Sequence, residues 1–264
     1  MNLRGQITIF VILAILIVTA IALVFILYNN QISDEPVINQ DKTLDEYEDC
    51  INDYVSEASE LIYENGGFLE MPQLNYLVTN TKGYYRQEKV ETIPYLCYTA
   101  LNYARCTPQI PLIVEHFENQ IKEYISSKVE FCFELVKSNL DEQAYQINAG
   151  VSSNLDVELR ERAILTRVDK VFTQSRAGNE EKFEKFSSRL SSPLYEVARV
   201  VRRIVDEEAL QCNSDYVQIM HEFPGINIRK FNADDGVSVY TIEDTKTDKE
   251  FKFAIRTCKQ ATPS

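Results

Sequence analysis

The chain has 264 residues, of which 45% are hydrophobic and 11% aromatic, so its composition is that of a folded protein. Its formal net charge of −13 argues against sequence-independent nucleic-acid binding, which needs a basic surface to neutralise phosphates. The same charge argues against a domain that lies flat on an anionic membrane, whereas it suits a soluble exported domain.

Residues 7–28 form an uninterrupted apolar run without a charged side chain. At about 1.5 Å per residue, a helix of this length covers the ~30 Å hydrocarbon core of a bilayer, so the run predicts a transmembrane helix and the lipid bilayer as its partner. Arg4 precedes it, and a mainly acidic segment from Asp34 follows it. The positive-inside bias therefore predicts one span in the cell membrane, with a cytoplasmic N-terminus and an extracytoplasmic C-terminal part.

A cleaved secretory signal is the alternative interpretation of this run. Such signals have apolar cores of roughly 7–15 residues followed by a small-residue cleavage site. Here the only A-x-A pattern, Ala20 to Ala22, lies inside the apolar run, and cleavage there would leave an apolar new N-terminus. We therefore expect the run to be retained as an anchor.

The segment Arg4-Gly5-Gln6-Ile7-Thr8-Ile9-Phe10 resembles the class III, prepilin-like signal of archaeal surface proteins. In that family a peptidase cuts between Gly and Gln and leaves the apolar helix on the mature protein. The resemblance implies that Arg4 is the basic flank, Gly5 the last residue removed and Gln6 the new N-terminus. Phe10 departs from the pilin pattern, which has an acidic residue near the fifth mature position, and this counts against filament assembly. A plain anchor without processing is the alternative.

The residues after the run predict a tether and then a helical part. Residues 29–42 are polar and contain Pro36, which predicts a short tether. Thr43 is expected to cap a helix that ends near Glu64, because apolar residues recur there at helical spacing. Asn65-Gly66-Gly67 ends this helix, since glycine suits the left-handed C-cap.

A hairpin and a second helix are expected next. Residues 76–95 favour extended structure with a turn at residues 81–83. Pro111 suits a first helical turn, and apolar residues at helical spacing predict a second helix from Pro111 to about Ser138.

The pattern changes after Asn139, where short extended segments replace the helical spacing. Ser192 is expected to cap one further helix, with Pro193 in its first position. The expected strands are residues 144–149, 155–160, 164–173, 182–190, 226–231, 237–243 and 251–258, with a hairpin turn at 177–180.

Together these elements predict an α+β fold: an N-terminal transmembrane helix followed by an ectodomain of amphipathic helices and an antiparallel β-sheet. We expect four parts: a cytoplasmic stub and anchor (1–28), a tether (29–42), a helical membrane-proximal domain with a small hairpin (43–139), and a domain of antiparallel sheet plus helix (140–264).

All six cysteines follow the apolar run, and an even number on the exported side is compatible with disulfides. Six cysteines allow 15 pairings. If the two helices are antiparallel neighbours, Cys50 and Cys132 can pair; Cys97 and Cys106 bracket a short loop and can close it, which leaves Cys212 with Cys258. Reduced, buried cysteines that pack as small apolar residues are the alternative.

The sequence shows no catalytic constellation, so we expect no catalytic residue, no metal site and no cofactor. It has two histidines, His116 on the expected solvated side of the second helix and His221, and neither lies in a metal-binding motif. No P-loop, Rossmann fingerprint or G-x-S-x-G motif occurs. Asp234-Asp235 precedes Gly236 and indicates a turn rather than a calcium site.

A group of tyrosines is the one candidate recognition surface. Tyrosine combines apolar area with a polar tip, which suits binding surfaces, although an aromatic mini-core under a loop is the alternative. The residues are Tyr84, Tyr85, Tyr95, Tyr98 and Tyr103.

Three function classes compete on these observations. An anchored binding or scaffolding protein of the cell envelope, with a protein partner there, needs no catalytic motif and is the expectation. A type IV pilin-like filament subunit is the first alternative, and an anchored envelope enzyme the second. The layout also resembles uncharacterised single-span membrane proteins of archaea, through the anchor, the Cys50 to Gly67 segment and the helix at Val114 to Ile125; that resemblance implies no known activity.

Overall fold

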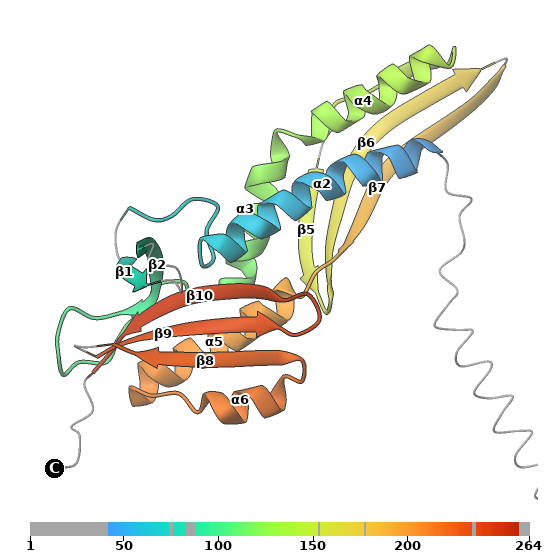
Figure 1. The fold of residues 1–264 in the computed structure, drawn as a ribbon. Coiled ribbons are helices and arrows are strands. Elements are labelled where there is room, and N and C mark those ends of the chain that lie inside the picture. Colours follow the sequence, from blue (N-terminus) through green and yellow to red (C-terminus); the bar gives the residue numbers. More distant parts are fainter. Residues whose placement is uncertain are drawn as a thin grey trace, which may run out of the picture. The chain divides into compact units, whose positions relative to one another are not determined.

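The computed structural model describes residues 42–73, 76–82, 88–152, 154–176, 178–233 and 236–258. Thr43–Ser264 form one unit by their internal contacts. Its described residues make an α+β fold with five helices and two β-sheets (Figure 1). The predicted span at residues 7–28 and most of the predicted tether lie outside the described residues. Within them, none of the helices has both the length and the apolar character needed to cross a bilayer.

Helix α2 (Lys42–Glu64) is amphipathic as its sequence predicts. Its apolar stripe is fully buried: Tyr47, Ile51, Val55, Ala58 and Ile62. Thr43 is not the N-cap that the sequence suggests, because the helix already includes Lys42. Thr43 is buried instead, and its hydroxyl donates a hydrogen bond of 2.8 Å to the Gln174 side chain. A tertiary contact therefore replaces the expected cap.

The second predicted helix is two helices, α3 (Ile113–Ser126) and α4 (Val129–Glu142). The break falls at Ser127 and Lys128, where the Lys128 N–H donates to Ile125 O at 2.8 Å. Serines favour such breaks because their hydroxyls compete for backbone hydrogen bonds. The apolar stripe continues on both sides of the break, so the periodicity in the sequence does not reveal it.

Helices α2 and α4 lie along one face of a four-stranded sheet (Figure 1). In this sheet β6 pairs with β7 along one edge and with β5 and β4 along the other, all antiparallel. An aromatic cluster fills the interface: the Tyr47 ring lies 4.6 Å from Phe133, and Phe133 lies 4.7 Å from Phe186. The strands are β4 (Gln146–Ala149), β5 (Asn154–Arg160), β6 (Ala163–Arg176) and β7 (Asn179–Ser191).

The other sheet has six strands in the order β1-β2-β10-β9-β8, with β3 paired to β2. Helix α5 (Leu194–Gln211) packs on it, and α6 (Tyr216–Glu222) lies beside β8 (Figure 1). The strands are β1 (Tyr76–Lys82), β2 (Glu88–Tyr98), β3 (Thr107–Pro108), β8 (Ile226–Asn232), β9 (Val237–Asp244) and β10 (Lys249–Arg256).

One strand pair departs from the predicted antiparallel sheet. Strand β2 pairs with β10 in parallel, with Tyr95 beside Ala254 and Tyr98 beside Arg256. The predicted 43–139 and 140–264 parts thus contribute strands to the same sheet. They also share one hydrophobic core, which includes residues of α2, α3, α5 and β10.

All six cysteines are paired, in the combination that the sequence favours. Cys50 bonds to Cys132 with 5.8 Å between their Cα atoms, and so links α2 to α4. Cys97–Cys106 closes the loop between β2 and β3, and Cys212–Cys258 links the end of α5 to the segment after β10; their Cα separations are 5.4 and 5.6 Å. Disulfides constrain the unfolded chain, and more so when they close long loops.

The sequence separations give a testable difference between two of these disulfides. Replacing Cys50 and Cys132 by Ala removes a link across 82 positions and should lower the free energy of unfolding by about 4.5 kcal/mol. Replacing Cys97 and Cys106, only 9 positions apart, should cost less, about 2.5 kcal/mol. Urea unfolding of both double variants, followed by circular dichroism, measures the two losses. An equal or larger loss for the short loop would contradict this account.

Candidate functional site

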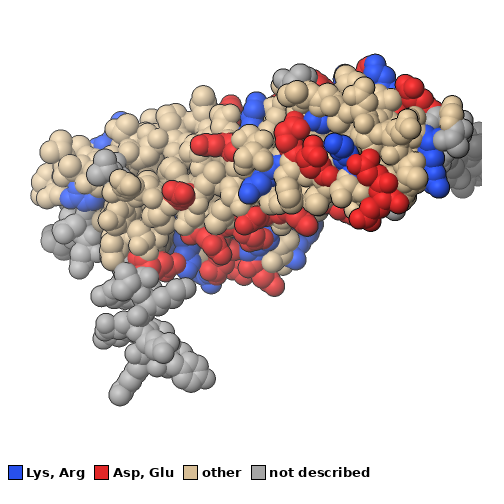
Figure 2. All heavy atoms as spheres, turned by 90° about the horizontal axis from the view of Figure 1, so that it is seen from above, with Lys and Arg blue, Asp and Glu red and all other residues tan. Residues whose placement is uncertain are grey.

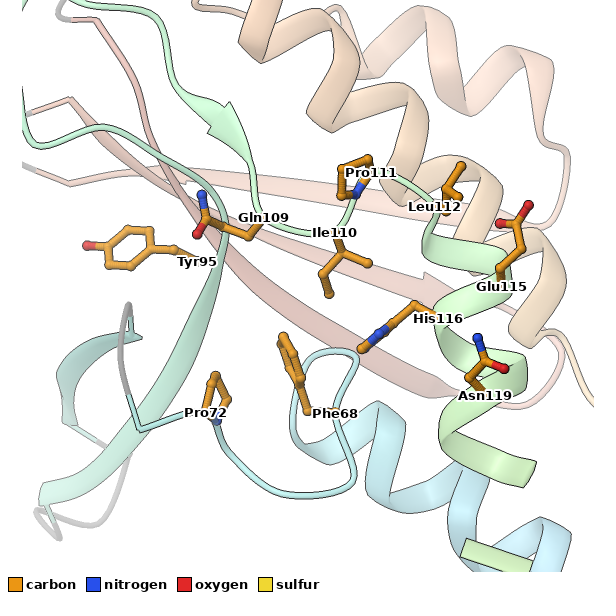
Figure 3. A pocket seen from close by; sticks show the side chains of 10 residues that line it. All are labelled: Phe68, Pro72, Tyr95, Gln109, Ile110, Pro111, Leu112, Glu115, His116 and Asn119. Atoms are coloured by element: carbon orange, nitrogen blue, oxygen red, sulfur yellow. The ribbon is translucent and has the colours of Figure 1, made fainter. Parts of the chain in front are cut away.

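The described residues enclose an apolar groove of about 620 Å³ next to the N-terminus of α3 (Figure 3). Its side chains come from four places: the loop after α2, strand β2, the segment after β3, and α3 itself. Phe68, Ile110 and His116 point toward one another across it. The lining residues are Phe68, Pro72, Tyr95, Gln109, Ile110, Pro111, Leu112, Glu115, His116 and Asn119.

Two glycines, Gly66 and Gly67, begin the loop that carries Phe68. Gly66 has φ +59°, and a Cβ there would lie 2.4 Å from Lys252 O, so only glycine allows this approach to β10. Beyond it, the Asn65 side chain donates to Leu69 O at 2.8 Å, and the Leu69 N–H donates to the Gln120 side chain at 2.9 Å. The loop therefore packs closely against β10 and is hydrogen-bonded to α3.

The opposite wall is the segment between β3 and α3. The Gln109 N–H donates to Leu96 O at 2.8 Å, which extends the pairing of β3 with β2 by one residue. The Cys97–Cys106 disulfide ties the start of this segment to β2. Pro111 then restricts the backbone ahead of α3. Ile110 and Leu112 are thus presented by a constrained segment, with Leu112 59% exposed.

His116 forms the floor of the groove on the α3 side. Its Nε2–H donates to Gly67 O at 2.9 Å, and its ring lies 5.2 Å from the Phe68 ring in an edge-to-face arrangement. Burial lowers the pKa of His116, although the hydrogen bond to Gly67 acts in the opposite direction. The predicted position on the solvated side of the helix is therefore wrong, because the loop after α2 folds over this face of α3.

The groove offers a recognition surface more than a reaction centre. Rings of Phe68, Tyr95 and His116 and the prolines supply apolar area, while polar side chains lie at the α3 side. Only one histidine and one carboxylate, Glu115, line it. Among the residues that the structure describes, no three His, Cys, Asp or Glu side chains are placed to hold a metal ion together.

The predicted tyrosine surface is brought together only in part. Tyr95 lines the groove but is 8% exposed, and the half-buried Tyr98 packs against it with 5.1 Å between the ring centroids. Tyr103 is 87% exposed and is not part of the groove lining. Tyr84 and Tyr85 lie outside the described residues.

Other predicted features fall in different places. His221 is exposed on α6. Gly5, Gln6 and the Asp234-Asp235 turn lie outside the described residues. The groove residues that sequence reasoning missed, Phe68 and Ile110 to Leu112, had one signal: they are apolar residues in segments rich in glycine or proline, where polar residues are usual.

Charge also distinguishes the groove from other surfaces. Figure 2 shows acidic and basic side chains interspersed on one face of the molecule, with the acidic ones more numerous. The groove instead holds a single charged side chain, Glu115, on its rim. An apolar hollow with a polar rim is the usual form of a binding site.

No protein-family model matches this sequence, and comparison with curated proteins and with solved structures likewise finds no match.

The lowered pKa of His116 gives a pH-dependent stability. In the unfolded chain a histidine titrates near pH 6.5, and in the folded protein it titrates lower, so its contribution is complete above about pH 6.5 and is lost as the pH falls through the folded-state pKa. The His116→Gln variant should flatten this part of the stability profile, measured by urea unfolding across the acidic range. His221→Gln, at the exposed histidine, should leave the profile unchanged. A profile that depends on His221 rather than His116 would contradict the assignment.

Proposed function

We propose that this protein is a membrane-anchored, extracytoplasmic binding protein of the cell envelope, whose groove holds an extended apolar segment of a protein partner. The observation that carries the proposal is the groove itself: aromatic and proline side chains on constrained segments, open to solvent, with a polar rim. Such surfaces bind extended segments because little flexibility is lost on either side.

The chemistry of the lining suggests what the segment contains. Aromatic rings and prolines form the kind of surface on which proline-rich, polyproline II segments dock. Glu115 is exposed on the rim, and the chain as a whole carries a net charge of −13. A partner segment with apolar or proline residues and a flanking basic residue is therefore the complementary one.

The location forms part of the same proposal. The apolar run at residues 7–28 supports a retained span in the lipid bilayer, with the Arg4-Gly5-Gln6 junction as its processing site. The three disulfides support an oxidising compartment for the folded unit.

Peptide selection tests the groove. The full-length protein in lipid nanodiscs should select, from a display library of short random peptides, sequences rich in apolar or proline residues with a flanking Lys or Arg. Leu112→Glu places a charge in the groove. It should weaken binding of the selected peptides by about tenfold or more, because apolar contact is lost and a charge must be desolvated.

The matched control is Leu210→Glu, since Leu210 is 61% exposed and Leu112 is 59% exposed, but Leu210 belongs to α5 and does not line the groove. This control should change the affinity for the selected peptides by less than about twofold. Failure to select any such peptide, or equal effects of the two substitutions, would overturn the groove as the binding site.

Intact mass tests the anchor. Protein extracted from membranes should have a mass that retains the apolar run and lacks Met1 to Gly5, as processing between Gly5 and Gln6 requires. The unprocessed mass would refute the processing step and leave the anchor. A mass that begins after residue 28 would refute the anchor as well.

A further inference from the structure

A second hollow, of about 370 Å³, lies on the surface of α5 where α3 and α6 approach it. Arginines from successive turns of α5 line it, together with two aromatic rings and an aliphatic side chain. The residues are Val114, Tyr195, Arg199, Arg202, Arg203, Asp206, Glu222 and Phe223. In a chain with an excess of acidic residues, a hollow with three arginines stands out.

Arg199 differs from its two neighbours in its partners. Arg202 pairs with Asp206 at 3.7 Å and Arg203 with Glu207 at 3.0 Å, each one turn further along the helix. The guanidinium of Arg199 instead lies 5.1 Å from the centre of the Phe223 ring and 5.8 Å from that of Tyr195. Among the described residues it has no carboxylate within ion-pairing distance, so its N–H groups are available to a ligand.

The two rings favour a particular kind of anion. Contact with aromatic rings orients a guanidinium and leaves its planar fork of donors for a planar acceptor, the geometry of a carboxylate. Phe223, Tyr195 and Val114 supply apolar surface next to that fork. A ligand that carries a carboxylate on an apolar body satisfies both features at once.

The charge of the lining points to a monoanion. Three arginines and two carboxylates, Asp206 and Glu222, line the hollow, but Arg202 and Arg203 are already paired with Asp206 and Glu207, so Arg199 is the lining arginine that is left to meet an anion. Glu222 is also held in place, since the Gln218 side chain donates to it at 3.2 Å. A phosphate dianion would meet about twice the repulsion from these carboxylates that a ligand with a single carboxylate meets.

We propose that this hollow binds a carboxylate borne on an apolar group, with Arg199 as the residue that holds the carboxylate. The chemistry is shared by a small aromatic acid and by the free C-terminus of a peptide that ends in an apolar residue. This site is separate from the groove beside His116, with which it shares no lining residue.

Calorimetric titration of the full-length protein in nanodiscs, at constant ionic strength, tests the proposal. The probes are benzoate, an acetylated peptide that ends in leucine with a free carboxylate, the same peptide as its amide, and inorganic phosphate. We expect benzoate or the free-acid peptide to bind, the peptide amide to bind at least about tenfold more weakly than the free-acid peptide, and phosphate to bind more weakly than the tighter of the two acids. Which of the two acids binds more tightly distinguishes the small-molecule source from the peptide source.

Arg199→Gln should weaken binding of the acid by at least about tenfold. Arg199→Lys should weaken it by an intermediate factor, because lysine keeps the charge but loses the planar fork of donors. Arg105→Gln, at an exposed arginine between β2 and β3, is the control and should change affinity by less than about twofold. Arg199 is itself exposed, so its substitution loses only its two ring contacts and should leave the protein folded, with a urea unfolding midpoint close to that of the unaltered protein. Absence of binding by both acids, phosphate binding as tightly as the tighter acid, or an equal effect of the Arg105 substitution would each overturn the proposal.

Discussion

The parallel pairing of β2 with β10 is the constraint on which the groove depends. It joins a strand from the first half of the chain to the last strand, with Tyr95 beside Ala254. The contact continues past the strands, where the Thr99 N–H donates to Arg256 O at 3.0 Å and the Arg256 guanidinium donates to Thr99 O at 2.5 Å. Because β3 pairs only with β2, this one pairing also places the segment that carries Ile110 and Leu112.

The same pairing places the opposite wall of the groove. Gly66 lies against Lys252 O of β10, so the loop that follows α2 is positioned by the strand next to β2. His116 then meets this loop through Gly67. Two segments far apart in sequence thus face each other because both rest on neighbouring strands of one sheet.

A partly buried ion pair links the two sheets around the shared core. Arg162, in the turn between β5 and β6 with φ +55°, donates to the Asp244 carboxylate at the end of β9 at 2.7 Å. Burial raises the pKa of Asp244, but hydrogen bonds from Arg162 and Thr247 outweigh it and lower that pKa overall. Glu118 of α3 accepts a hydrogen bond from the Leu159 N–H of β5 at 2.8 Å. This contact ties α3, and with it the α3 side of the groove, to the four-stranded sheet, which the ion pair ties to the other sheet.

Local patterns in the sequence predict α2, α5 and the residues of α3 and α4, most strands and the disulfides, but not α6. The stripe of α2 and that of α3 and α4 recur at helical spacing, and they place Cys50 and Cys132 on facing sides. The break at Ser127 is not predictable from a stripe that continues across it. The burial of His116 and the β2–β10 pairing are also not predictable, because they arise from contacts between distant segments, and the groove arises from the same contacts.

Site-specific photo-crosslinking tests the central claim, that the groove is where this protein holds a partner. A photoreactive amino acid at position 112, in the membrane-bound protein, should give a discrete adduct whose crosslinked peptide is an extended apolar segment with a flanking basic residue. The same amino acid at position 210, which has similar exposure on another surface, should not give that adduct. The same adduct from both positions, or none from position 112, would contradict the account.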